Sequence, residues 1–94
     1  MNTYNLKLHK TYYNKGFFNV PVDYDRYVQL IEGDLTIMLG HEIIPGRSTR
    51  KANRNGTARI FGNARLRDWL QANFDMHEVV SIDFLDPNKI RIHT

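Results

Sequence analysis

The chain has 94 residues, of which 41% are hydrophobic and 24% are charged, as is typical of one small folded domain over residues 1–94. The absence of cysteine excludes disulfides, thiolate catalysis and cysteine-based zinc sites. No apolar run approaches the roughly 18 residues that a membrane span needs, and the first residues show no signal-peptide pattern. We therefore expect no membrane contact, and a location that is cytoplasmic and nucleoid-associated in a bacterium or nuclear in a eukaryote.

Hydrophobic patterning in the first third of the chain predicts two short strands and a helix. Leu6 and Leu8 alternate with polar residues, which is the period of a half-buried strand. A polar and aromatic loop over residues 11–16 leads into an extended stretch over residues 17–20. Pro21 then opens a helix, because its fixed φ suits the first helical turn and its missing N–H would be unpaired there. The apolar stripe that this helix is expected to bury consists of Tyr24, Tyr27, Val28 and Ile31.

The middle third predicts three more strands around a basic segment. Residues 35–39 and 42–44 have the apolar pattern of strands, and the pair Pro45-Gly46 after them predicts a break. Asn55-Gly56 is a turn signal, after which residues 57–61 return as a strand. The basic segment is therefore expected to lie between two strands.

A second helix and a hairpin complete the predicted elements. A helix begins after the cap at Asn63, and Leu66 and Leu70 share its apolar face. Residues 79–92 alternate in hydrophobicity on both sides of a proline turn, which predicts a hairpin. The predicted fold is mainly β: a small open barrel of about seven strands, with two short α-helices that cap its openings.

The net charge of +3 conceals an uneven distribution of ionisable side chains. Residues 47–67 hold seven basic side chains and no acid, whereas the other 73 residues hold six basic and ten acidic side chains. A solvated surface mixes the two signs because like charges repel, so a stretch of one sign in a folded domain indicates an anionic partner. A basic loop without a partner is the alternative that charge alone leaves open.

Within this segment, residues 47–59 carry the side chains that proteins use on nucleic acids and few that anchor a core. Arginine forms two parallel hydrogen bonds with guanine and asparagine does so with adenine, and serine, threonine and lysine bind phosphates. A second polar, basic and aromatic stretch covers residues 10–15, and no acid precedes Asp23. Its tyrosines suit either contact with a nucleic acid or packing over the core. Together the two stretches favour nucleic-acid binding.

Catalytic and metal-binding patterns are weak. No two of the four histidines stand at i and i+4, and the candidate loop glycines are isolated, so helical zinc sites and glycine-rich phosphate loops are unsupported. Asp83 and Asp86 near Lys89 are the best candidates for a small metal-dependent nuclease. The polar face of a strand and a proline turn explain the same carboxylates without catalysis. We expect no enzyme activity, no cofactor and no bound metal.

The order of parts carries a resemblance to a known family. A strand and a polar stretch lead to an apolar doublet with a Val-Pro step over residues 17–21 and then to a short helix. Later the basic stretch leads through Phe61-Gly62 to a helix with aromatic anchors and a hairpin. This order resembles the DNA-binding pseudobarrel, the fold of plant B-three transcription-factor domains and of the recognition domains of EcoRII-type restriction endonucleases. The match departs at residues 75–78, where this family usually turns through Gly-Asp.

The resemblance covers nearly the whole chain and implies a seven-stranded open barrel that grips duplex DNA in the major groove with two arms. It assigns residues 10–15 to a first arm and residues 47–59 to a second arm. The predicted DNA contacts are Lys10, Thr11, Tyr12, Tyr13, Asn14, Lys15, Arg47, Ser48, Thr49, Arg50, Lys51, Asn53, Arg54, Asn55, Thr57 and Arg59.

These arms predict sequence-specific binding of double-stranded DNA by the recognition module of a restriction–modification enzyme or regulator, with a fused or associated nuclease or methyltransferase. With six to eight phosphate contacts, the logarithm of the binding constant would fall with the logarithm of the salt concentration with a slope of about −5 to −7. Alanine at Arg50 and Arg54 is expected to reduce DNA binding without unfolding the domain. The alternative is an RNA-binding or protein-interaction module, such as a toxin–antitoxin partner, that uses the same basic face.

Overall fold

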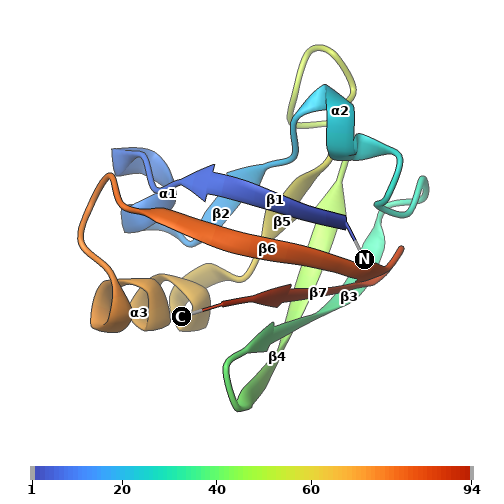
Figure 1. Ribbon diagram of the computed structural model, residues 1–94. Coiled ribbons are helices and arrows are strands. Elements are labelled where there is room, and N and C mark those ends of the chain that lie inside the picture. The colour runs from blue at the N-terminus through green and yellow to red at the C-terminus, as the bar shows by residue number, and fades with distance from the viewer. Residues whose placement is uncertain (1, 94) are drawn as a thin grey trace.

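Seven strands and three short helices make up residues 2–93, the part of the chain that the computed structural model describes (Figure 1). The strands are β1 (Asn2–Lys7), β2 (Phe17–Asn19), β3 (Gly33–Leu39), β4 (Glu42–Thr49), β5 (Arg59–Phe61), β6 (Val79–Asp86) and β7 (Lys89–Ile92). The helices are α1 (Lys10–Lys15), α2 (Val22–Asp25) and α3 (Asn63–Asn73). No helix in this part of the chain has the length and apolar character that a membrane crossing requires.

The strands form one mixed sheet in the order β1-β6-β7-β3-β4-β5-β2. Every neighbouring pair is antiparallel except β3 and β7, which run parallel. The sheet curls into a half-barrel whose two edge strands, β1 and β2, are joined through α1 (Figure 1). The prediction of a small open β-barrel is confirmed, and so is the hairpin, which β6 and β7 form.

Alternating apolar side chains from the strands fill the inside of the half-barrel. Leu35, Ile37 and Leu39 of β3 are all at most 5% exposed, as the period of two predicts. Leu66 and Leu70 bury the apolar face of α3 against the same core. Helices α1 and α3 contact each other at one end of the sheet, and α2 lies away from them (Figure 1).

Strand β4 continues through Pro45 and Gly46, so the predicted break at this pair is wrong. Strand β5 pairs with β4 only at Arg47–Thr49, so Pro45 lies where β4 has β3 as its one neighbour and the missing N–H is tolerated. A Cβ on Gly46 would come within 2.5 Å of Ile37 Cδ1, so close packing requires glycine here. The continuation draws the start of the second arm into the sheet.

The predicted loop over residues 11–16 is also wrong, because α1 occupies most of it. The helix ends at Gly16, whose φ of 74° is left-handed and whose N–H bonds the carbonyl of Tyr12. The carbonyl of Gly16 accepts bonds of 2.9 Å from the backbone N–H groups of Gly62 and Asn63, which tie α1 to the start of α3. Residues 2–93 therefore contain three helices where the sequence predicts two.

Helix α2 is a single turn, so the predicted apolar stripe stops early. Val28 is buried as expected, but Ile31 is 83% exposed. The carbonyl of Asp25 accepts the N–H of Val28 at 3.1 Å, and the N–H of Gln29, which would continue an α-helix to that carbonyl, donates to the carbonyl of Pro87 at 2.8 Å instead. A distant segment thus takes the N–H that would continue the helix predicted from local periodicity.

Candidate nucleic-acid interface

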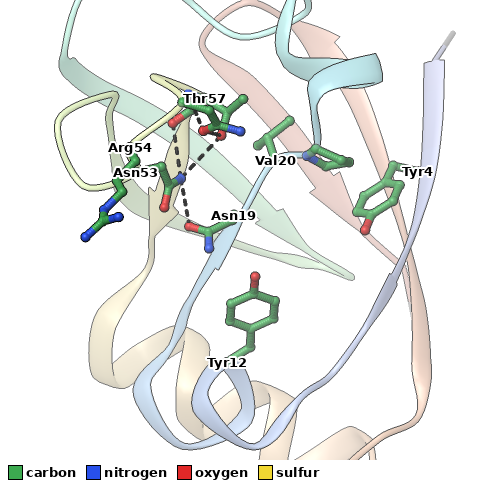
Figure 2. A pocket seen from close by; sticks show the side chains of 9 residues that line it. Tyr4, Tyr12, Asn19, Val20, Asn53, Arg54 and Thr57 are labelled. Carbon is green, nitrogen blue, oxygen red and sulfur yellow. Dashed lines mark hydrogen bonds between the residues drawn. The ribbon is translucent and has the colours of Figure 1, made fainter.

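An open cleft of about 530 Å³ lies between the edges of the half-barrel, and we call it the seam cleft (Figure 2). It combines side chains from the edge strand β1, from α1, from the end of β2 and from the loop before β5. The lining residues are Tyr4, Tyr12, Asn19, Val20, Pro21, Asn53, Arg54, Asn55 and Thr57. The cleft therefore joins one residue of the predicted first arm with four of the second arm.

The side chain of Arg50 is held inside the fold, which corrects its assignment as a DNA contact. Its guanidinium pairs with the carboxylate of Asp25, and Nη2 donates to the carbonyl of Val28 at 3.0 Å. Asp25 also accepts a 2.7 Å bond from the backbone N–H of Ala58 through its other oxygen. Both side chains of the pair are less than a quarter exposed. We therefore expect the replacement of Arg50 by alanine, alone or together with Arg54, to destabilise the domain, because it would leave the charge on Asp25 without its partner.

Arg59 and Asn53 are also engaged within the protein. Arg59 Nε donates to Asn19 Oδ1 at 2.8 Å, and its guanidinium lies 4.5 Å from the ring centroid of Phe17. Asn53 Nδ2 donates to Asn19 Oδ1 at 3.0 Å and to the carbonyl of Thr57 at 3.2 Å, and Asn53 Oδ1 accepts from Arg59 at 3.2 Å. These bonds hold the base of the second arm against the end of β2.

Three more predicted contacts serve the fold or are neutralised. Ser48 is 2% exposed and accepts a bond from Gln29, so it cannot reach DNA, and Thr57 is 8% exposed and bonded to Asn55. Arg47 is half exposed but lies 3.4 Å from a carboxylate oxygen of Glu32. The Thr49 hydroxyl, with the charges of Lys51 and Arg47, lowers the pKa of Glu32, so this carboxylate stays ionised beside them. Strand β4 and the turn before β5 thus bury Ser48 and Thr57, and of the two only Thr57 lines the seam cleft.

The tip of the second arm is the part that faces solvent. Lys51, Arg54 and Asn55 are exposed, and no acidic group within residues 2–93 lies within 4 Å of either cation. Asn55 Oδ1 accepts bonds from the backbone N–H and the hydroxyl of Thr57 at 3.2 and 2.8 Å, which shape the turn. Arg54 extends outward from the loop (Figure 2). The tip thus presents exposed cations on a base that hydrogen bonds hold in place.

The first arm presents its polar face from α1. Lys10, Thr11, Asn14 and Lys15 are exposed. Tyr13 instead supports the fold, because its hydroxyl donates to the carbonyl of Phe74 at 2.7 Å. Tyr12 lies at the cleft, with its ring centroid 5.8 Å from that of Phe17.

Sequence reasoning missed four cleft residues, namely Tyr4, Asn19, Val20 and Pro21. Tyr4 lies on β1, in the part of the strand that precedes the predicted start at Leu6. Burial, followed by the charges of Tyr12 and Tyr24, raises the pKa of Tyr4. The continued alternation of Tyr4 with Leu6 and Leu8 was the available signal.

Of the two carboxylates considered for a nuclease, Asp83 is bonded to other side chains of the fold. Asp83 is 6% exposed and accepts bonds from the Thr3 hydroxyl at 2.6 Å and from His93 Nε2 at 2.5 Å. These two hydrogen bonds, the one from Thr3 first, lower the pKa of Asp83. No group of three or more candidate metal ligands occurs within residues 2–93.

Comparison with known proteins gives no match to a protein-family model and no match to a curated protein.

Proposed function

We propose that the chain binds double-stranded DNA sequence-specifically through the exposed parts of both arms, without catalysis of its own. The observation that carries the proposal is the seam cleft, which Tyr12 of the first arm and Arg54 of the second arm both line. A cleft that presents amide and aromatic side chains, with Arg54 in its lining and further exposed cations on the two arms, suits a polyanion whose bases are also read. A DNA-binding role also accounts for a loop tip whose cations the fold does not use.

The pairing of arginines revises the expected strength of the phosphate contribution. Arg47 and Arg50 have acidic partners, and Arg59 is engaged with Asn19 and Phe17. The exposed cations that remain in the two arms are Lys10, Lys15, Lys51 and Arg54. Four phosphate contacts give a log–log salt slope of about −3 to −4, in place of about −5 to −7.

A selection from random duplexes at physiological salt, followed by a salt titration on the winning sequence, tests this proposal. We expect a recovered consensus and a slope near the value for four contacts. Competition with RNA and with heparin decides between duplex DNA and the alternatives of an RNA or an acidic protein surface. Equal competition by all polyanions, or an affinity that does not change with salt, would contradict the proposal.

Arg54→Ala is the matching variant, and Arg65→Ala is its control. Both residues are exposed arginines, but Arg65 lies on α3 beside a separate hollow that Glu42 and Asp68 line. Loss of one phosphate contact is expected to reduce the slope by about 0.9 in Arg54→Ala. The slope of Arg65→Ala should stay at the wild-type value, and an equal reduction in both would show that only net charge matters.

The family assignment remains part of the proposal. An open barrel of seven strands, with a helix-borne first arm after β1 and a loop-borne second arm before α3, supports a place among the DNA-binding pseudobarrels. On this basis a fused or associated nuclease or methyltransferase is the expected partner. The expected compartment is the nucleoid of a bacterium or the nucleus of a eukaryote.

A further inference from the structure

We propose that the seam cleft is a pocket for one unpaired nucleobase with a keto edge, read by the side-chain amide nitrogen of Asn19. This inference rests on the proposed function, and it adds which part of the nucleic acid the cleft takes and which chemical feature it selects.

The orientation of the Asn19 amide follows from its neighbours. Arg59 can only donate, and it bonds both Asn19 Oδ1 and Asn53 Oδ1, whereas the carbonyl of Thr57 can only accept, and it bonds Asn53 Nδ2. The donor Arg59 and the acceptor carbonyl of Thr57 therefore fix which atom is oxygen and which is nitrogen in the side-chain amides of Asn19 and Asn53. Asn19 Oδ1 is therefore the atom that Asn53 and Arg59 hold, and Asn19 Nδ2 is left without a partner from this network.

The free amide nitrogen faces the cleft. Figure 2 shows Asn19 with its oxygen toward Asn53 and its nitrogen on the side of the Tyr12 hydroxyl. Asn55 has the same polarity, because Thr57 uses its Oδ1 and leaves its Nδ2 free. The oriented amides of the cleft thus present donors, and a ligand must bring acceptors.

The shape and the walls suit a base. A volume of about 530 Å³ lies within the range of about 300–1,000 Å³ that is usual for small-ligand pockets. Tyr4 on β1 and Tyr12 on α1 supply aromatic rings to two walls of the cleft (Figure 2), and unpaired bases stack on such rings while hydrogen bonds read their edges. Guanine O6 and thymine or uracil O4 are keto oxygens at the positions where adenine and cytosine carry amino groups, so a donor in the cleft that meets this position of the base favours guanine, thymine and uracil.

A nucleic-acid strand would reach the cleft along the two arms. Arg54 points outward at the cleft margin, where a phosphate would lie, and the helix α1 that carries Tyr12 also carries the exposed Lys10 and Lys15. A base that enters from this path is either extruded from a duplex or unpaired in a single strand. Both sources present the same keto edge to Asn19.

The first test is a titration of the full chain with dGMP, dTMP, dAMP, dCMP and inorganic phosphate. NMR monitors each titration through the side-chain amide resonances of Asn19 and Asn55. We expect the two keto nucleotides to shift these resonances with affinities about five- to tenfold above those of the amino nucleotides. Inorganic phosphate should leave them unchanged. Equal affinity for all four nucleotides, or the same shifts with phosphate alone, would overturn the proposal.

Asn19→Asp isolates the donor. Aspartate keeps the oxygen that holds Asn53 and Arg59 and replaces only the cleft-facing nitrogen by an acceptor. The keto preference is therefore expected to be lost or reversed. Asn14→Asp on the exposed face of α1 makes the same change of charge away from the cleft and should keep the preference. If Asn19→Asp does not fold, Tyr12→Ala replaces it, and unchanged nucleotide affinity in that folded variant contradicts a base stacked there.

Oligonucleotides that carry 2-aminopurine next to a guanine identify the source of the base. A fluorescence rise on binding the duplex indicates extrusion, and a rise with the single strand alone indicates an unpaired base; either result supports the pocket. No rise with either substrate overturns it. Salt-dependent duplex binding without keto selection would defeat this inference alone, whereas keto selection without duplex binding would defeat the proposed function alone.

Discussion

The two arms flank the same cleft, but the fold holds them by different means. The first arm is a helix that ends at a left-handed Gly16, and backbone bonds and the Tyr13 hydroxyl tie it to the region of α3. The second arm is a loop on a polar base, where Arg50 pairs with Asp25 and Arg59 bonds Asn19. A helix satisfies its own backbone, whereas a loop needs side chains to bond its carbonyls and amides.

This difference shows why the number of basic residues in a sequence overestimates the cations that are available for binding. Arg50 and Arg54 are four residues apart in one basic stretch, yet the first is held by two segments of the fold, residues 25–29 and Gly56, and the second extends into solvent. The second arm uses several of its arginines in ion pairs and hydrogen bonds within the fold, whereas the lysines of the first arm stay exposed. The arms therefore contribute similar numbers of exposed cations despite their unequal sequence charge.

Arg50→Ala is expected to break the second arm and to have the largest effect on stability. Removal of the guanidinium leaves the Asp25 carboxylate mostly buried beside unpaired carbonyls, at a cost of about 2–4 kcal/mol in the free energy of unfolding. Urea denaturation measures this loss. Arg54→Ala is the control and should stay within about 0.5 kcal/mol of wild type. Equal stability of the two variants would mean that the base of the arm does not depend on Arg50.

Gly16→Ala tests the corresponding anchor of the first arm. The φ of 74° disfavours a side chain, and a Cβ would come within 2.0 Å of the Asn63 carbonyl oxygen. Strain and displacement together should lower the free energy of unfolding by about 2 kcal/mol or more. Gly56→Ala has a similar φ of 75° with open space around its Cβ, so it separates backbone strain from the close approach. Similar losses in the two variants would show that the contact with Asn63 adds nothing.

Tyr13→Phe probes the smaller contact that the first arm makes with the end of α3. It removes the hydroxyl that bonds the Phe74 carbonyl and keeps the ring. We expect a loss of about 1 kcal/mol in thermal or urea unfolding. Tyr12→Phe is the control at the cleft. An equally large loss of unfolding free energy in that variant would contradict the conclusion that the Tyr13 hydroxyl supports the fold and the Tyr12 hydroxyl does not.

Asp83 gives a pH-dependent contribution that lies outside both arms. Because the bonds from Thr3 and His93 lower its pKa in the folded protein, its stabilising effect is present above the ordinary aspartate pKa of about 3.9 and is lost as the pH falls through the lower folded value. Asp83→Asn should flatten the acid limb of the stability profile. An acid limb that is unchanged in this variant would assign the loss to other carboxylates.

The parts of the fold that follow local rules could be predicted from sequence. The alternation at residues 35–39 and 79–92 gives real strands, because a period of two is a property of each strand alone. The end of α2, the continuation of β4 through Pro45 and the helix at 10–15 could not be predicted, because they depend on contacts between strands or segments: the Gln29 N–H bonds the Pro87 carbonyl, Pro45 pairs with β3 alone, and the Asn63 N–H bonds the Gly16 carbonyl. The cleft was half predicted: its tyrosine and loop residues belong to the arms, but Tyr4 and Asn19 do not.

The amino-acid sequence by itself determined that this protein is a small β-rich domain with two basic stretches, since composition and periodicity are properties of neighbouring residues. Only the tertiary structure decided which cations remain exposed and which polar atoms face the cleft. Hydrogen bonds and ion pairs join residues such as Asp25 and Arg50, or Asn19 and Arg59, which the chain separates by 25 and 40 positions. Their partners follow from the folded geometry, and no local pattern encodes them.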